Sequence, residues 1–392
     1  MPIANFNFYN PTRVIFGTNT ICELDKYLPK DKIFILCYGA GSIKKNGVYG
    51  QVVKALGSRK HEEFGGIEPN PDYDTLMKCV DKCKQIGLDK VYILSVGGGS
   101  TADGCKFICA AACYTDGEPY EMLFNNAINV KKALPLAVVL TLPATGSESN
   151  KNSVISYRKM NRKQMITNEY LFPEIAILDP NTMISLPLSQ IQNGVVDAFV
   201  HICEQYVTVL QDADCQDRYC EGILMTLVKN GAKIIKDKND YVARSNIMWA
   251  ANQALNTLVG QGVPQDWATH YIGHELTANL DLDHGQTLAL VQPRLFELKI
   301  ENKKDKLALL GEKVFGIKES SVLESAKKTI IAIENFYNNV LGVKTRISQL
   351  SCSQDKSWIE PLIERLKKDN IKWGEHGDIT YVEVKEIINR CY

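Results

Sequence analysis

The feature that most constrains the fold is a repeated order of buried strand, glycine turn and helix in the first 180 residues. The apolar run KIFILCY (32–38) ends at GAGS, and KVYILSV (90–96) ends at GGGS. Each turn is followed by a helical pattern, over about 42–57 after the first and through Ala112 after the second, and PLAVVLTLP (135–143) is a third apolar run. Continuous apolar strands that alternate with helices indicate a parallel, doubly wound sheet, whose ligands bind at the carboxyl ends of the strands.

The pattern changes after AILDP (176–180). From Ser189 onward the apolar residues recur mostly at helical spacing, as in VVDAFVHICEQYVTVL (195–210). We therefore predict an α/β protein in which residues 1–180 form a dinucleotide-binding α/β domain and residues 181–392 form an all-helical metal-binding and catalytic domain. A chain of 392 residues is long enough for two such cores.

The helical half contains a spaced set of acid and histidine residues. Asp197 and His201 are four positions apart, as are His270 and His274, and His284 lies in the short segment NLDLDHG (279–285) that comes next. Residues four apart lie on one helical face, so each pair can direct two side chains to one point. A carboxylate and three imidazoles suit either Fe(II) or Zn(II), so the ligand types alone do not identify the metal. The set predicts a divalent metal site.

Each histidine of this set also has a simpler interpretation, because a single histidine on an amphipathic helix is more often a core or surface residue than a ligand. Asp197, however, lies among apolar residues of its helix, and a buried carboxylate needs a partner. The pair His274–Glu275 resembles the start of a zinc-protease H-E-x-x-H motif, but position 278 is alanine, so the protease interpretation fails.

The two glycine turns are candidates for holding a nucleotide. In VGGGSTAD (96–103) the glycines permit a tight turn, and the helix that follows offers free N–H groups to a phosphate. This is not the G-x-G-x-x-G pattern, and a plain turn is the alternative. Gly39 stands where NAD-selective sheets usually present an acid, and Ser42, Lys44 and Lys45 follow, so we expect NADP(H). The alternative for the lysines is surface solvation.

Composition excludes several other classes. The 45 basic and 45 acidic residues leave no net charge, so no nucleic-acid partner is expected. The longest apolar run is interrupted by prolines, and MPIANFNFYNP does not resemble a signal peptide, so we expect a soluble cytoplasmic protein with no membrane partner. The twelve cysteines form no C-x-x-C pair and are expected to be reduced core thiols.

Long blocks, in order along nearly the whole chain, resemble the iron-containing, group III alcohol dehydrogenases, the superfamily that also contains dehydroquinate synthase. Within it, the resemblance is to the NADPH-dependent aldehyde reductase and butanol dehydrogenase branch. The blocks are NPTRVIFG (10–17), GGIEPNP (65–71), VGGGS (96–100), LPATGSESN (142–150), NGVVDAFVHICEQYV (193–207), GVPQDWATHYIGHELTA (262–278) and DHGQTLALVQP (283–293).

The resemblance implies a dehydroquinate synthase-like fold and a role for each candidate residue. It implies that one divalent ion is held by Asp197, His201, His270 and His284, and that His274 lies beside the site and passes protons. The cofactor residues that it implies are Gly39, Ser42, Asn70, Gly97, Gly98, Gly99, Ser100, Asp103, Thr141, Asn150 and Lys163. Among these, Gly98, Gly99 and Ser100 are expected at the pyrophosphate. Asn70 and Ser42 are expected by the adenosine, and Thr141, Asn150 and Lys163 on the ribose and nicotinamide side. Asp103 matches a family position without an assigned role, and Ala40 departs from the extra glycine common in this branch.

The predicted function is reversible hydride transfer between NADP(H) and short to medium aliphatic aldehydes or primary alcohols, with Fe(II) or Zn(II) polarising the carbonyl. The resemblance also implies a homodimer, with an edge strand from the amino-terminal segment as the expected contact. A lyase or cyclase of the dehydroquinate synthase kind, dependent on a metal and NAD, is one alternative. It would need basic residues for a phosphorylated substrate, whereas the ligand segments contain Trp267, Tyr271, Leu276 and Leu282, which favour small apolar carbonyls. A protein that binds metal and nucleotide without catalysis is the other alternative. We expect the reaction to take place in a cleft between the two halves.

Overall fold

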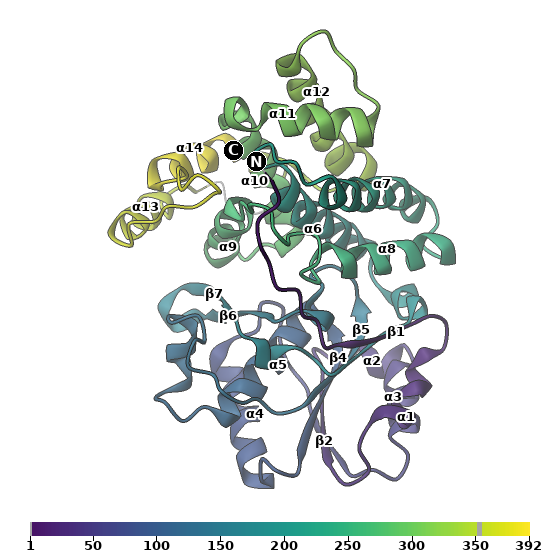
Figure 1. The fold of residues 1–392 in the computed structure, drawn as a ribbon. Helices are drawn as coiled ribbons and strands as arrows, with labels where there is room; N and C mark the ends of the chain where they lie inside the picture. Colours follow the sequence, from purple (N-terminus) through teal and green to yellow (C-terminus); the bar gives the residue numbers. More distant parts are fainter. Residues whose placement is uncertain (1, 351–354) are drawn as a thin grey trace. The chain divides into compact units, whose positions relative to one another are not determined.

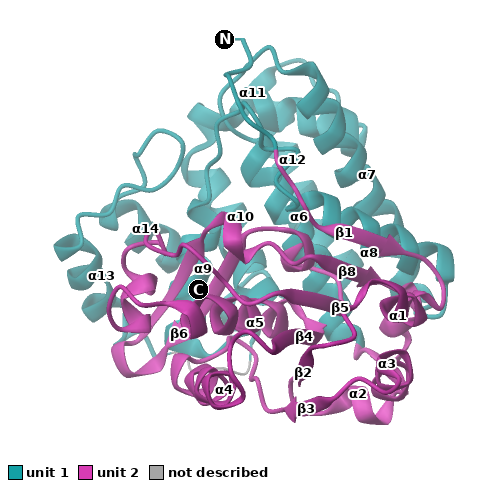
Figure 2. Cartoon of the chain, turned by 60° about the horizontal axis from the view of Figure 1, so that its bottom comes forward, with its two compact units in different colours: residues 1–8, 188–392 teal, residues 9–187 magenta. Residues whose placement is uncertain are grey.

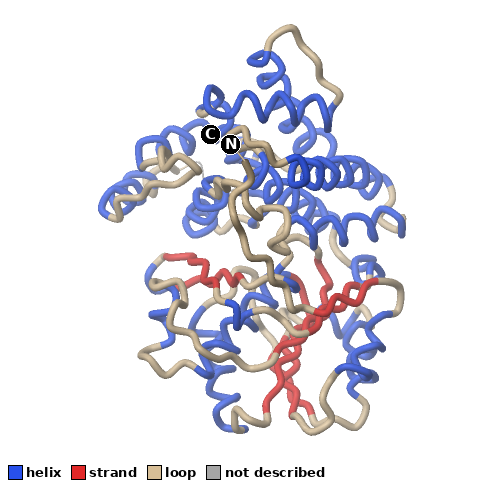
Figure 3. The backbone as a smooth tube through the Cα atoms, viewed as in Figure 1, coloured by secondary structure: helices blue, strands red, loops and turns tan. Residues whose placement is uncertain are grey.

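The computed structural model describes residues 2–350 and 355–392, and the chain divides into two compact units (Figures 1 and 2). One unit is Tyr9–Pro187, and the other is Met1–Phe8 with Leu188–Tyr392. All the named strands lie in the first unit, and helices build the second (Figure 3). The predicted fold class, a parallel-sheet α/β domain followed by a helical one, is confirmed.

The first unit is built on a six-stranded parallel sheet with the order β1-β8-β5-β4-β2-β3. Its strands are β1 (Arg13–Phe16), β2 (Ile33–Cys37), β3 (His61–Phe64), β4 (Val91–Gly98), β5 (Leu136–Leu142) and β8 (Ile175–Leu178). The three apolar runs of the sequence thus form β2, β4 and β5. Since β2 and β4 are parallel neighbours, with Cys37 beside Ser95, the glycine turns that follow them emerge at the same edge of the sheet.

Both faces of this sheet are covered, which explains why its strands are apolar without alternation. In β2, Ile35 and Cys37 pack into one hydrophobic core, whereas Phe34 and Leu36 pack into a second core on the other face. The helices α4 (Tyr73–Ile86) and α5 (Gly99–Cys113) contribute to the first core. The second core contains residues of α1 (Leu24–Tyr27) and α3 (Val48–Leu56).

Two features of this unit differ from the sequence expectation. The helix expected over about 42–57 is two helices, α2 (Ser42–Lys45) and α3, because Asn46 and Gly47 interrupt it, and Gly47 has φ 84°. An antiparallel pair, β6 (Asn152–Tyr157) and β7 (Arg162–Thr167), follows the LPATGSESN block. The pair was not expected, because its sequence is largely polar and shows no clear alternation.

The second unit contains the long helices that carry the acid and histidine set. They are α6 (Leu188–Tyr206), α7 (Asp214–Lys236), α8 (Tyr241–Ala254), α9 (Ala268–Leu280), α10 (His284–Leu298), α11 (Ile300–Leu310), α12 (Val322–Asn335), α13 (Ile359–Lys368) and α14 (Tyr381–Cys391). Within the described residues, no helix is both long enough and apolar enough to cross a bilayer. The cysteines of the described residues are free thiols, and most of them are buried.

Candidate active site

Helix α6 presents three acid or histidine side chains to one side of the helical unit. Asp197, His201 and Glu204 are spaced by four and three residues and are all buried, at 2–3% exposure. This spacing gathers them on one helical face, and the apolar residues around them, such as Val196 and Val200, exclude water.

Two other helices bring the remaining histidines to the same place. His270 and His274 lie one turn apart on α9, and His284 is the first residue of α10. The start of α10 lies directly against α6: a Cβ atom added to Gly285 would come within 2.4 Å of the backbone oxygen of Asn193, so a larger residue there would force the two helices apart. Asn193 also donates a hydrogen bond to Asp283, which precedes His284.

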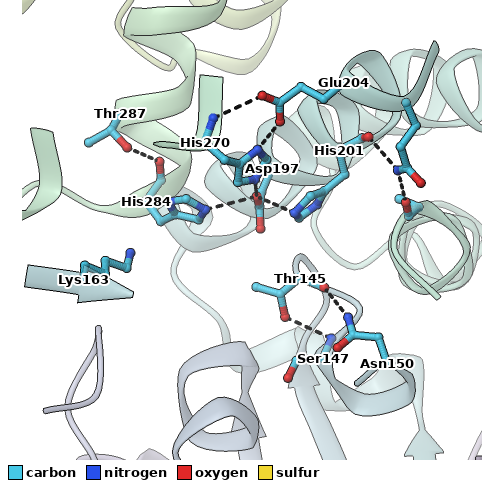
Figure 4. Close-up of polar contacts among 12 residues, drawn as sticks. Thr145, Ser147, Asn150, Lys163, Asp197, His201, Glu204, His270, His284 and Thr287 are labelled. Carbon is cyan, nitrogen blue, oxygen red and sulfur yellow. Dashed lines mark hydrogen bonds and ion pairs between the residues drawn. The ribbon is translucent and has the colours of Figure 1, made fainter. Parts of the chain in front are cut away.

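Three of the candidate ligands converge on a carboxylate oxygen of the fourth, Asp197 (Figure 4). The Nε2 atoms of His201, His270 and His284 lie 3.6, 3.4 and 3.6 Å from Asp197 Oδ1. The ligand atoms of Asp197, His201 and His270 all lie within 4.8 Å of one another. In a tetrahedral site with bonds of about 2.1 Å, adjacent ligand atoms are about 3.4 Å apart, so the arrangement has the dimensions of a divalent metal site.

Glu204 orients His270 toward this point. Its Oε2 atom accepts a short hydrogen bond from His270 Nδ1, and its Oε1 atom accepts the backbone N–H of His270 at 3.1 Å. With Nδ1 engaged, Nε2 faces Asp197, and this buried nitrogen forms no well-aligned hydrogen bond within the described part of the chain. A carboxylate behind a histidine is the usual support of a metal-ligating imidazole. Sequence analysis missed Glu204, although an acid three residues after His201 in an apolar helix was a usable signal.

The electrostatics differ between the two most buried imidazoles. Burial lowers the pKa of His201 to about 4, which keeps the ring neutral, as a metal ligand must be. Burial also acts to lower the pKa of His270, but the charge of Glu204 and the contacts with Asp197 and Glu204 outweigh it and raise that pKa to about 9. A cation placed at the convergence point would take over the role of the proton on His270.

His274 and Trp267 border the convergence point. The His274 ring centroid lies 5.2 Å from that of His284 and 6.3 Å from that of His270. The Trp267 ring lies 6.2 Å from His201 and 5.6 Å from His270. His274 is thus close to the candidate ligands. Among the described residues, the group of three whose ligand atoms lie within 4.8 Å of one another includes neither His274 nor His284. His284 is a candidate ligand because its Nε2 atom lies 3.6 Å from Asp197 Oδ1.

In the sheet unit, the glycine turn after β4 forms the start of α5. Gly97 and Gly98 end the strand, and Gly99 and Ser100 open the helix. A Cβ atom on Gly99 would lie 2.4 Å from Thr145 Oγ1, so only glycine lets the segment that contains Thr145 approach this closely. The result is a row of backbone N–H groups at a helix N-terminus, suited to a phosphate.

Asp103 and Lys106 fix the segment that carries Asn150. Asp103 Oδ1 accepts the Ser147 hydroxyl at 2.5 Å, and its Oδ2 accepts the N–H of Val154 at 3.1 Å. The fully buried Lys106 donates to Asn150 Oδ1 at 2.9 Å, and burial lowers its pKa to about 8. Asp103 thus forms hydrogen bonds with other residues of the protein, Ser147 and Val154, and it lies in the first turns of α5, just after the glycine turn.

Of the other expected cofactor residues, Gly39, Ser42 and Thr141 lie near the ends of β2 and β5, and Asn70 and Lys163 form a pair. Lys163 of β7 donates to Asn70 Oδ1 at 2.8 Å, which brings these two together, and Thr141 is buried near the end of β5. Gly39 follows β2 directly, and Ser42 opens α2.

A carboxylate that sequence analysis did not consider lies near Gly39. Glu63, in β3, accepts hydrogen bonds at 2.6 Å from Lys44, Tyr38 and Tyr49, and these contacts lower the pKa of Glu63 to about 2. Lys44 is therefore an ion-pair partner here and not simply a solvated lysine. Lys44 and Glu63 are 19 positions apart, so no local pattern in the sequence indicates the pairing.

Comparison with known proteins covers the whole chain. Residues 11–180 match the family described as "Iron-containing alcohol dehydrogenase", and residues 191–392 match "Fe-containing alcohol dehydrogenase family, C-terminal". The chain is 48% identical over 379 residues to the NADPH-dependent aldehyde reductase YqhD of Escherichia coli, covering 96% of each protein. It is 34% identical to the NADH-dependent butanol dehydrogenase B of Clostridium acetobutylicum, covering 98% of each. The crystal structure of YqhD from E. coli K-12 matches with a TM-score of 0.96 and 45% identity over 100% of both chains.

Proposed function

Because the chain belongs to the iron-containing alcohol dehydrogenase family, we propose that it is a metal-dependent enzyme that transfers a hydride between NADP(H) and short to medium aliphatic aldehydes and their primary alcohols. The observation that carries this proposal is the convergence of three imidazole nitrogens, at 3.4–3.6 Å, on Asp197 Oδ1. The relatives named above are oxidoreductases of aldehydes or alcohols, so the lyase alternative is not part of the proposal.

The proposed ligands of the ion are Asp197, His201, His270 and His284. A divalent ion, Fe(II) or Zn(II), supplies Lewis-acid polarisation of a carbonyl group when it is bound. The chain contributes the geometry: α6, α9 and α10 hold the ligands, and Glu204 fixes the ring of His270 through two hydrogen bonds. The apolar surroundings of α6 keep water away from Asp197 and His201 and strengthen the electrostatic interactions there.

His274 is proposed as the residue that supplies the proton to the product alcohol, with water as the alternative donor. Its ring lies 5.2 Å from that of His284, which is near enough to serve the site without being a ligand. Imidazole is suited to this task because it exchanges a proton readily near neutral pH.

The sheet unit is proposed to hold the nucleotide. The N-terminus of α5, with Gly98, Gly99 and Ser100, takes the pyrophosphate, and Gly97 keeps the turn open. Ser42 is placed at the adenosine end, and Thr141, Asn150 and Lys163 are placed at the nicotinamide end. Asn70, which the resemblance assigned to the adenosine, accepts a hydrogen bond from Lys163 at 2.8 Å, so we place it beside Lys163 and not at the opposite end. Asp103 supports the segment with Asn150. In functional terms the proposal assigns residues 1–180 to nucleotide binding and 181–392 to metal binding and catalysis.

The preference for NADP(H) is supported by Gly39 and Lys44. The absence of an acidic side chain at position 39 leaves room for a 2′-phosphate, and Lys44 offers it a positive charge. The relatives differ, since YqhD is named as NADPH-dependent and the butanol dehydrogenase B as NADH-dependent. Glu63, which holds Lys44, is the group that a 2′-phosphate would have to displace.

The function is tested by following NADPH oxidation with butanal, first on the purified protein, then after complete chelation, and then after Fe(II) or Zn(II) is returned. The proposal expects activity, its loss and its recovery, because the ion is needed to stabilise charge on the substrate oxygen. Activity that survives complete metal removal would refute it, and bound NADPH that no aldehyde oxidises would indicate a protein without catalysis.

We also propose a cytoplasmic homodimer. The strand β1 is at the edge of the sheet. Its last residue, Phe16, is 40% exposed, and Tyr9, in the segment before the strand, is 58% exposed. An open strand edge with exposed aromatic residues is suited to pairing with a second copy. Sedimentation equilibrium tests this: a monomer at all concentrations would contradict it.

A further inference from the structure

Trp267, beside the candidate metal ligands, has a backbone conformation that a bulky residue seldom adopts. Its dihedral angles are φ 62° and ψ 1°, in the left-handed region, and it is the residue directly before α9. This conformation costs about 1–2 kcal/mol for a residue with a Cβ atom, so contacts from the surroundings must maintain it. The indole contacts the rings of His201 and His270, and its Nε1 donates to Gln265 at 2.8 Å.

The residue before it, Asp266, is held on three sides. Its backbone N–H donates to the Glu204 carbonyl oxygen at 2.9 Å, which ties it to α6. Its Oδ1 atom accepts the N–H of Ala268 at 2.7 Å and so caps the start of α9. Its Oδ2 atom accepts from Lys303 Nζ at 2.6 Å. Asp266 therefore fixes the chain on both sides of Trp267.

Lys303 of α11 joins this loop to two other parts of the unit. It is 3% exposed, and besides Asp266 its ammonium group donates to the Val207 carbonyl oxygen at 3.0 Å and to Glu375 Oε1 at 2.8 Å. An ammonium group has three hydrogens, and these three acceptors use all of them. Val207 directly follows α6, so one buried cation connects the end of the helix with Asp197 and His201 to the start of the helix with His270.

We propose that Lys303, Asp266 and Glu375 form an anchoring cluster that positions Trp267 and the first turn of α9, and through them His270, for metal binding. The inference rests on the proposed metal site and extends it to residues that touch neither the ion nor a substrate. They are positioning residues. Three hydrogen-bonded ionisable groups in a dry interior are costly to separate, which makes the cluster a stiff link between α6 and α9.

The chain offers a matched control for the loss of a buried lysine. Lys306 lies one turn further along α11, is also 3% exposed, and pairs with Asp217 of α7 at 2.6 Å. Both Lys303→Met and Lys306→Met remove a buried cation and leave carboxylates without it, so both are expected to lower the free energy of unfolding. Only the first breaks the connection to Asp266.

The test measures the dissociation constant for Co(II), by competition with a chromophoric chelator, together with the visible spectrum of the bound ion. We expect Lys303→Met to raise this constant about tenfold and to alter the spectrum, whereas Lys306→Met should stay within about twofold of the wild type. Should Lys303→Met fail to fold, Glu375→Gln weakens the same cluster more gently and should raise the constant about threefold. Equal constants for the cluster variant and the Lys306→Met protein would overturn the inference.

A double-variant cycle with Trp267→Gly tests the route of the effect. Glycine adopts the left-handed conformation without help, so Lys303→Met should cost clearly less affinity in the Trp267→Gly protein than in the wild type. An undiminished cost in that background would contradict positioning through Trp267. A wild-type protein that binds no Co(II) would refute the proposed metal site itself, which separates the failure of that proposal from the failure of this one.

Discussion

Replacing Glu204 by glutamine should weaken metal binding without removing a ligand. The carboxylate accepts two hydrogen bonds from His270, one at the ring Nδ1 and one at the backbone nitrogen. A glutamine side chain has one oxygen and one NH2 group, so it can accept from only one of these donors comfortably and would place its NH2 group against the other. The change also removes the charge that raises the pKa of His270 and increases the basicity of its ring.

The expected size follows from these contacts. A hydrogen bond to a charged group contributes about 1.5–3 kcal/mol, and a buried donor left unsatisfied costs about 1–3 kcal/mol. Part of this cost falls on the metal-free protein too, so we expect a net loss of about 2 kcal/mol in metal binding, or roughly 30-fold in the dissociation constant. Chelator competition with Zn(II) or Co(II) measures this constant directly.

Glu221→Gln is the matched control for this variant. Glu221 is 3% exposed and accepts from the Tyr206 hydroxyl at 2.9 Å, but none of its hydrogen bonds reaches a candidate ligand. We expect this control to keep the wild-type metal affinity within about twofold. Equal metal affinity in the Glu204→Gln and Glu221→Gln proteins would show that Glu204 does not support a ligand.

Three further predictions separate the roles assigned above. His201→Ala should abolish stoichiometric metal binding. His274→Ala should retain the ion and lower kcat by about 100-fold, because this change removes a proton donor and not a ligand. Metal analysis and turnover measurements check both variants, and loss of the ion in His274→Ala would contradict the assignment. Gly99→Ala should weaken NADPH binding about tenfold, because the added methyl group meets Thr145 at 2.4 Å and displaces the turn. Fluorescence titration measures the dissociation constant of NADPH. An unchanged constant would show that the turn does not hold the nucleotide. Burial raises the pKa of Glu375 from 4.5 to about 7. The contribution of this group to folding stability is therefore greatest below pH 4.5 and declines as the pH rises through 7. Urea unfolding at pH 5 and 8 should show this decline in the wild type and a smaller one in Glu375→Gln, and equal declines would exclude Glu375 as its source.

The sequence allowed prediction of those parts of the fold and site that depend on local spacing. Asp197 and His201 were placed on one helical face because they are four residues apart, and α6 carries them so. The apolar runs predicted β2, β4 and β5 because both faces of these strands are buried. The return of His284 toward Asp197 was anticipated from the short segment before it, although the close approach of Gly285 to Asn193, which determines its position, was not.

What escaped prediction depends on contacts between distant residues or on weak local patterns. Lys303 and Glu375 are 72 positions apart, and no periodicity connects them. Glu204 was not singled out, because its importance appears only when α9 places His270 beside it. A single helix over about 42–57 was predicted because its apolar spacing continues across Gly47, where the left-handed backbone interrupts the helix.

We propose that one ion, held by Asp197, His201, His270 and His284, is the site of hydride transfer with NADP(H). Anomalous diffraction at the absorption edge of the bound metal, from crystals grown with NADPH, tests it most directly. We expect one peak surrounded by these four side chains at about 2.0–2.2 Å, with the nicotinamide ring facing it. A peak elsewhere, a peak without these ligands, or a nicotinamide ring remote from the ion would contradict the account.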